Sequence, residues 1–155
     1  MIYHFLCKIP SVYILCLLFT VYSCKKSVDY NQVDEQIIQQ YIADNNLNAQ
    51  PTGSGLYYVI YNQGNGAPPN LNSSVTVVYV GKLTDGTIFD QSNPLGATFP
   101  LANVIQGWQE GIPLFREGGS GILLIPSSLG YGSQSVGNIP ANSVLIFEIS
   151  LIHVF

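Results

Sequence analysis

The sequence predicts an α+β domain in which an antiparallel sheet carries a short helix on one face. Two observations indicate this fold class. Several short segments rich in Val, Ile, Leu and Tyr are bounded by Gly, Pro, Asn or Ser, which is typical of strands joined by turns. Inside that region only the segment after Pro100 spaces its apolar residues as a helix does. The length of 155 residues allows one such domain with short additions.

The composition excludes several classes of protein. Only 9% of the residues are charged and the net charge is −4, whereas about a quarter of an average soluble domain is charged. So few charges exclude a coiled coil and a charged disordered tail. They also argue against nucleic acid as a partner, because a nucleic-acid binder needs clustered Lys and Arg to neutralise phosphates. A hydrophobic content of 47% raises the question of a membrane segment.

The apolar excess is concentrated in residues 1–23, which are predicted to be a signal peptide. Residues 9–22 form a nearly unbroken apolar run that follows Lys8. This run is shorter than the ~20 residues needed to span a bilayer, and its length is typical of the apolar region of a signal peptide. After residue 23 the apolar content is that of an ordinary globular domain.

The end of this run resembles the lipobox of bacterial lipoproteins. The sequence Val21-Tyr22-Ser23-Cys24 has an aliphatic residue at −3 and a small residue at −1. The resemblance implies that Cys24 is lipidated on sulfur and that its acyl chains anchor the protein to a membrane. An ordinary signal peptide or a short anchor helix, with Cys24 incidental, is the alternative. The chain beyond Cys24 has no cysteine for a disulfide, a thiol nucleophile or a metal site.

Residues 24–32 are polar and are predicted to form a tether. The spacing of apolar residues then predicts a helix over about 33–46, ended by two asparagines, within an N-terminal helical segment of residues 33–50. We expect this helix to pack on the domain or to act as a spacer; a dimerisation helix is the alternative. The main domain, residues 51–155, opens with a turn cluster at residues 51–55.

Five strands and one helix are predicted in the main domain. The strands are expected at residues 56–62, 74–83, 87–90, 121–126 and 143–154. The helix is predicted from the spacing of Val104, Ile105, Trp108 and Ile112.

Acid–base and metal chemistry have few candidate residues here. His153 is the single histidine after residue 23, and its strand pattern predicts a strand residue rather than part of a catalytic triad or a zinc site. The glycine-rich residues 118–121 lack the Gly-Lys-Ser/Thr ending of a phosphate loop. The chain offers aromatic residues instead, which are interpreted either as core packing or as the lining of a pocket.

Six motifs, taken in order, resemble the FKBP-type peptidyl-prolyl cis-trans isomerase domain. They are VVYVG at 77–81, DGTIFD at 85–90, VIQGWQEG at 104–111, IPSSLGYG at 125–132, IPAN at 139–142 and VLIFE at 144–148. Each motif alone is a weak signal, but six with this order and spacing across about residues 56–155 are a strong one. With its lipobox and short helix, the chain is similar to exported FKBP-type lipoproteins of Gram-negative bacteria.

The resemblance implies a twisted antiparallel sheet wrapped around a short helix, with an apolar pocket between them. Trp108 would form the floor of this pocket, with Val104 and Ile105 beside it. The walls and further substrate contacts would come from Tyr79, Phe89, Phe147 and Phe99.

Three residues at the pocket rim carry implied polar roles. Asp90 would present a carboxylate, Tyr131 would donate its hydroxyl to a substrate carbonyl, and Ile139 would offer its backbone N–H and side chain. The family often has a further aromatic residue where this chain has Ala97. That difference bears on substrate preference and on the binding of inhibitors.

The function that the resemblance implies is acceleration of rotation about X–Pro bonds in exported proteins. Rotation breaks no σ bond, and its barrier of ~18–20 kcal/mol is lost amide resonance. A dry pocket with preorganised donors can therefore catalyse it, and no cofactor or metal is expected. A non-catalytic FKBP-like chaperone or scaffold lipoprotein is the alternative.

The expected partners follow from the same resemblance. They are proline-containing polypeptides, macrolide inhibitors of the kind this family binds, and a membrane that holds the lipid anchor. The protein is expected to be a monomer, exported and facing the periplasm of a Gram-negative bacterium.

Overall fold

The structure, a computed structural model, describes residues 28–155 and confirms the predicted α+β class. The predicted signal peptide and the candidate lipid site Cys24 lie outside the described residues. Seven antiparallel strands form one sheet in the order β1-β2-β6-β7-β3-β4, and β5 also pairs with β3. The strands are β1 (Gln50–Pro51), β2 (Tyr57–Asn62), β3 (Ser74–Lys82), β4 (Ile88–Gln91), β5 (Ala97–Pro100), β6 (Ser120–Ile125) and β7 (Leu145–Val154).

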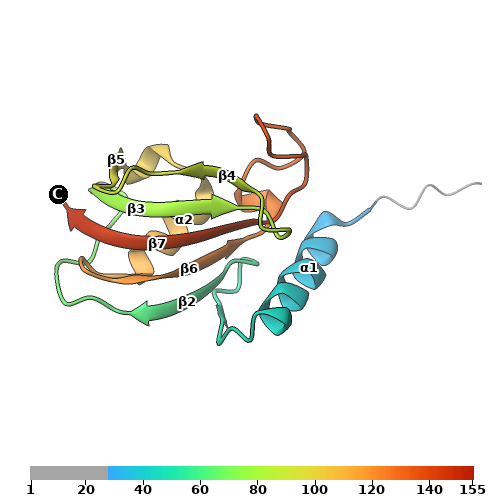
Figure 1. Cartoon of the computed structure of the whole chain (residues 1–155), viewed down its shortest axis with the longest axis horizontal. Helices are drawn as coiled ribbons and strands as arrows, with labels where there is room; N and C mark the ends of the chain where they lie inside the picture. The colour runs from blue at the N-terminus through green and yellow to red at the C-terminus, as the bar shows by residue number, and fades with distance from the viewer. Residues whose placement is uncertain (1–27) are drawn as a thin grey trace, which may run out of the picture.

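Two α-helices pack on opposite faces of this sheet (Figure 1). They are α1 (Tyr30–Asp44) and α2 (Gln106–Gly111). Three 3₁₀ turns connect the elements: η1 (Leu101–Asn103), η2 (Ile112–Leu114) and η3 (Ser127–Leu129). No helix within residues 28–155 is long and apolar enough to cross a membrane.

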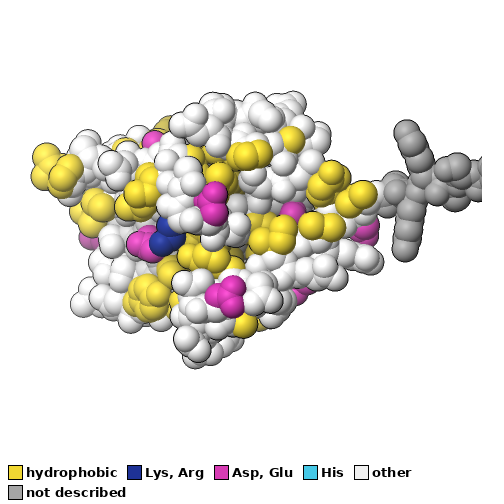
Figure 2. Space-filling view, turned by 45° about the vertical axis from the view of Figure 1, so that its right-hand side comes forward, with side chains coloured by type: hydrophobic (Ala, Val, Ile, Leu, Met, Phe, Trp, Pro, Cys, Tyr) yellow, Lys and Arg dark blue, Asp and Glu magenta, His cyan; other side chains and the backbone are white. Residues whose placement is uncertain are grey.

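The alternation of side chains along the strands explains why the sheet can bury both faces. In β6, Leu123 and Ile125 join the core around α2, whereas Ile122 and Leu124 join the core under α1. The sequence of a strand that is covered on both faces is typically a continuous apolar run, and the sequence of β6 is such a run. On the face shown in Figure 2, charged side chains are few and lie among apolar and uncharged polar ones.

The N-terminal helix begins earlier than the apolar spacing predicted. Asp29 caps it by accepting a hydrogen bond from the backbone N–H of Asn31 (3.1 Å), so α1 begins at Tyr30 rather than at residue 33. The last residues of the predicted tether therefore belong to the helix. The helix ends at Asp44 as its asparagine signal predicted, because Asn46 adopts a positive φ of 51°.

The internal helix is shorter than its predicted apolar pattern. Val104 is extended, Ile105 is the N-cap, α2 begins only at Gln106, and Ile112 opens the following 3₁₀ turn. Gly107 and Gly111 bring α2 close to the sheet, because a Cβ at either position would lie 2.5 Å from a side chain of β6. The prediction that one helix carries all four apolar residues was therefore wrong.

Two short strands were missed by the sequence prediction. β5 pairs with β3 and ends at a proline, and β1 is a two-residue edge strand paired with β2. Both are too short to show the period-two pattern on which the prediction relied. The other five strands lie where they were predicted, with ends that differ by up to two residues.

Candidate active site

A cavity of about 310 Å³ lies between the sheet and the segment that leads into α2. Its size is at the lower end for ligand pockets, which suits a single small ring and its flanking peptide groups. It is lined by Tyr79, Asp90, Phe99, Asn103, Val104, Ile105, Trp108, Tyr131 and Phe147. Eight of these nine residues are sequence-predicted site residues, so the fold brings most of the predicted set together.

The aromatic rings of the cavity are packed edge to face around Trp108. The ring centroid of Trp108 lies 5.1 Å from that of Tyr79, 5.7 Å from Phe99 and 5.2 Å from Phe147, with interplanar angles of 78–90°. Such T-shaped pairs are favoured by the quadrupoles of aromatic rings. Because each ring blocks rotation of its neighbours, the walls of the cavity are preformed.

Phe89 supports the wall from outside the cavity. It is absent from the cavity lining but packs edge to face on Phe147, with ring centroids 5.5 Å apart. Gly81 makes this contact possible, because a Cβ there would lie 2.7 Å from the Phe89 ring and 2.8 Å from the Phe147 ring. The structure thus places Phe89 behind the wall, whereas the family motif assigned it to the wall.

The Asp90 carboxylate is held at the rim by the Tyr79 hydroxyl, which donates to Asp90 Oδ2 at 2.7 Å. Burial, and then the hydrogen bond to Asp90, raise the pKa of Tyr79 well above its usual value of about 10. The hydroxyl therefore stays protonated at neutral pH and remains a donor. This contact fixes the carboxylate on an exposed strand.

Tyr131 reaches the cavity from the loop after η3 and is 36% exposed. Partial burial, and then the nearby Asp90 charge, raise its pKa. The phenol is therefore neutral at physiological pH. A neutral phenol at the rim of an apolar cavity is suited to donate a hydrogen bond to a carbonyl group.

Ile139 lies outside the residues that line the cavity. Its side chain is buried in the α2-side core, but its backbone N–H donates to the carbonyl of Val136 at 2.9 Å, and Val136 N–H returns a bond of 3.0 Å. This closed loop occupies the N–H that the family motif assigned to the substrate. A substrate carbonyl would have to displace Val136 to reach it.

The sequence reasoning missed Asn103 and Gln109. Asn103 lines the cavity from η1. The Gln109 side chain donates to the carbonyls of Val104 (2.8 Å) and Ala102 (3.2 Å) and so holds the extended segment that presents Val104 and Ile105. Neither role has a signal in the sequence, because polar residues at such positions normally face solvent.

The sequence matches a known protein family. The sequence profile described as FKBP-type peptidyl-prolyl cis-trans isomerase matches residues 66–152, more than half of the chain. The chain belongs to this family. All six motifs noted above lie inside or at the border of the matched FKBP-type segment, whereas α1 and β2 lie before it.

Relatives of this FKBP-type chain include proteins from Gram-negative bacteria. It is 42% identical over 133 residues to the FKBP-type peptidyl-prolyl cis-trans isomerase FkpA of Aeromonas hydrophila, covering 83% of this chain and 50% of the relative. It is 39% identical over 138 residues to the outer membrane protein MIP of Legionella longbeachae, covering 84% and 59%. The chain thus spans about half the length of these relatives.

A solved structure supports the same assignment. A crystal structure of a peptidyl-prolyl cis-trans isomerase from Pseudomonas syringae matches with a TM-score of 0.71 and 32% identity, covering 81% of this chain and 92% of that one. Within residues 28–155, no group of three His, Cys, Asp or Glu side chains is placed to hold a metal ion.

Proposed function

We propose that this chain accelerates rotation about X–Pro bonds in polypeptides. The observation that carries the proposal is the preformed aromatic cavity around Trp108, with the Asp90 carboxylate and the Tyr131 hydroxyl at its rim, in a member of the FKBP-type family. The cavity has the size and apolar character for a prolyl ring. Its rim has one acceptor and one donor for the flanking peptide groups.

The proposed mechanism is preferential binding of the twisted amide. The planar X–Pro amide is the more dipolar form and is better solvated by water, so a dry cavity disfavours it relative to the twisted state. The prolyl ring would stay against Trp108 while the Tyr131 hydroxyl holds the carbonyl, so that only the C–N bond turns. No proton is transferred, and the residues act by position and by excluding water.

A protease-coupled assay with peptides that carry Leu or Phe before Pro tests the activity. Uncatalysed isomerisation takes tens to hundreds of seconds, so acceleration is readily measured. We expect Asp90→Ala to reduce the acceleration about tenfold, and Asp44→Ala, which alters a carboxylate on α1, to leave it unchanged. A folded wild-type protein that gives no acceleration would favour the alternative of a non-catalytic FKBP-like scaffold.

We propose further that the protein is exported as a lipoprotein anchored through Cys24 and that it acts, as a monomer, on proline-containing segments of exported proteins. The lipobox at residues 21–24 and the outer-membrane relative support this. Mass spectrometry of the wild type is expected to detect acyl chains on Cys24. The Cys24→Ser variant should lose them and leave the membrane fraction, whereas Cys16→Ser should keep both. An unchanged distribution for Cys24→Ser would contradict the anchor.

Binding of macrolide inhibitors is a related proposal. The aromatic lining of the cavity supports it, and the small residue at Ala97, on β5 beside the aromatic wall, favours weaker binding than an aromatic residue there would give. Competition between a macrolide and the prolyl peptide in the same assay tests this proposal.

A further inference from the structure

Asp34 is a buried carboxylate on α1, outside the candidate active site. It has no exposed surface, and its Oδ2 accepts hydrogen bonds from the Ser127 N–H at 2.7 Å and from the Ser127 hydroxyl at 2.6 Å. Its Oδ1 has no hydrogen-bond partner among residues 28–155. Burying a carboxylate costs free energy, and apolar side chains often serve stability as well. The contact is therefore better explained by the geometry it imposes than by net stability.

Ser127 connects Asp34 to the loop that carries Tyr131. The Ser127 carbonyl accepts hydrogen bonds from Gly130 N–H at 3.0 Å and from Gly132 N–H at 2.8 Å, the two residues that flank Tyr131. The Gly132 carbonyl in turn accepts from Asn142 N–H at 2.8 Å. Because glycine on both sides leaves the backbone free to turn, these hydrogen bonds, rather than local sterics, set the position of Tyr131.

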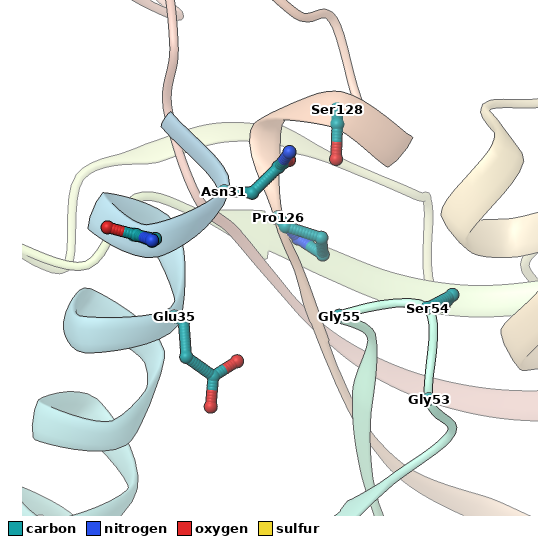
Figure 3. A pocket seen from close by; sticks show the side chains of 8 residues that line it. Asn31, Glu35, Gly53, Ser54, Gly55, Pro126 and Ser128 are labelled. Atoms are coloured by element: carbon teal, nitrogen blue, oxygen red, sulfur yellow. The ribbon is translucent and has the colours of Figure 1, made fainter. Parts of the chain in front are cut away.

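The surrounding contacts hold α1 on the sheet without Asp34. Ile38, one turn later, is fully buried against β2, β6 and β7, and the Tyr57 hydroxyl donates to Glu35 at 2.6 Å. Figure 3 shows Glu35 and Asn31 on α1 facing the Gly53–Gly55 turn and the segment of Pro126 and Ser128 across a hollow. The helix therefore has its own packing, and Asp34 adds a direct bond to η3.

We propose that Asp34 is a positioning residue for Tyr131, through which α1 orients the hydroxyl at the rim of the prolyl cavity. The proposal rests on the proposed function for the role of Tyr131 in isomerisation. Asp34 lies before the segment matched by the family profile, whereas Ser127 and Tyr131 lie inside it. The N-terminal helix would thus be part of the catalytic apparatus rather than a spacer alone.

The experiment compares Asp34→Ala with Ile38→Ala, which removes apolar packing on the same helix but no bond to η3. The kcat and KM for a Leu-Pro peptide are measured below the unfolding range of both variants. The chain is also labelled with 3-fluorotyrosine, and the ¹⁹F resonance of Tyr131 is assigned with Tyr131→Phe. We expect Asp34→Ala to lower kcat three- to tenfold, the effect of one misplaced hydrogen bond, and to shift the Tyr131 resonance towards that of an exposed tyrosine.

A rescue variant, together with the Ile38→Ala control, keeps the test decisive. Asp34→Asn keeps an oxygen that can accept both Ser127 bonds, so it should restore most of the kcat and the resonance. Ile38→Ala should lower the melting temperature and leave both readouts at their wild-type values. The proposal is overturned if Asp34→Ala leaves the Tyr131 resonance in place, or if Ile38→Ala moves it equally. A resonance that shifts in an enzyme indifferent to Tyr131→Phe would support the positioning and contradict the proposed catalytic role of Tyr131.

Discussion

The two faces of the sheet are built from the same strands but are packed differently. The α2 face gathers the aromatic residues, with Tyr79, Trp108 and Phe147 meeting edge to face around a cavity. The α1 face is packed mainly by aliphatic residues, which are Ile38, Val59, Ile122, Leu124, Val144 and Ile146. Aromatic rings that meet at right angles can leave space between the walls of a cavity. Branched aliphatic side chains instead interdigitate and fill the interior to the packing density of native proteins. Both faces are buried cores, but only the α2 face leaves a cavity among its aromatic rings, whereas the aliphatic residues of the α1 face hold the N-terminal helix on the sheet.

The α1 face gives the largest expected effect on stability. Ile38→Ala removes a fully buried side chain and is expected to lower the free energy of unfolding by about 2–5 kcal/mol, measured by urea denaturation. The kcat/KM per folded molecule should be unchanged, because Ile38 contacts no residue of the cavity lining. A parallel loss of kcat/KM would show that the two faces are not separable.

On the α2 face, we expect a substitution that lowers activity but has little effect on stability. Tyr79→Phe keeps the ring packing but removes the hydroxyl that holds Asp90, so we expect a loss of kcat/KM of about tenfold with a stability cost of only ~0.5–1.5 kcal/mol. The matched control is Tyr61→Phe, at an exposed tyrosine of β2. If both variants keep full activity, the Asp90 contact has no role in the prolyl site.

Alkaline pH should lower the free energy of unfolding through the two tyrosines of the cavity. The pKa of Tyr79 and that of Tyr131 are raised in the folded protein, so above pH ~10 the unfolded chain loses these protons first. The unfolded state then binds fewer protons, and the free energy of unfolding falls as the pH rises. Between pH 6 and 9 these two groups contribute no slope. Urea denaturation between pH 9 and 11 should show a shallower decline for Tyr79→Phe than for the wild type.

The smallest effect is expected at an ion pair between two neighbouring strands. Lys82 of β3 contacts Glu148 of β7, and both side chains are partly exposed. Lys82→Met should lower the free energy of unfolding by about 0.2–1 kcal/mol at low salt and by less in 0.5 M salt. Prolyl isomerisation should not change. A salt-independent loss would mean that the packing of the Lys82 stem, rather than its charge, stabilises the pair.

Several elements were predictable from local patterns alone. The apolar run of β6 and the helical spacing of Val33, Ile37, Ile38 and Tyr41 appear directly in the sequence, because periodicity depends only on near neighbours. The strand β5 and the bounds of α2 were not predictable in this way. β5 exists because β3 offers it an edge, and α2 begins late because Gln109 holds the preceding segment extended.

In the candidate site, too, some features were predictable from the sequence and others were not. The sequence by itself determined the fold class, most of the strands and eight of the nine residues that line the cavity, because six motifs in order specify a family. Only the tertiary structure decided that Phe89 lies behind the wall, that the Ile139 N–H is bonded within its own loop, and that Asp34 contacts Ser127 from 93 residues away. The physical reason is that these outcomes depend on which groups burial brings into hydrogen-bond or ring contact, and no local pattern records such long-range neighbours.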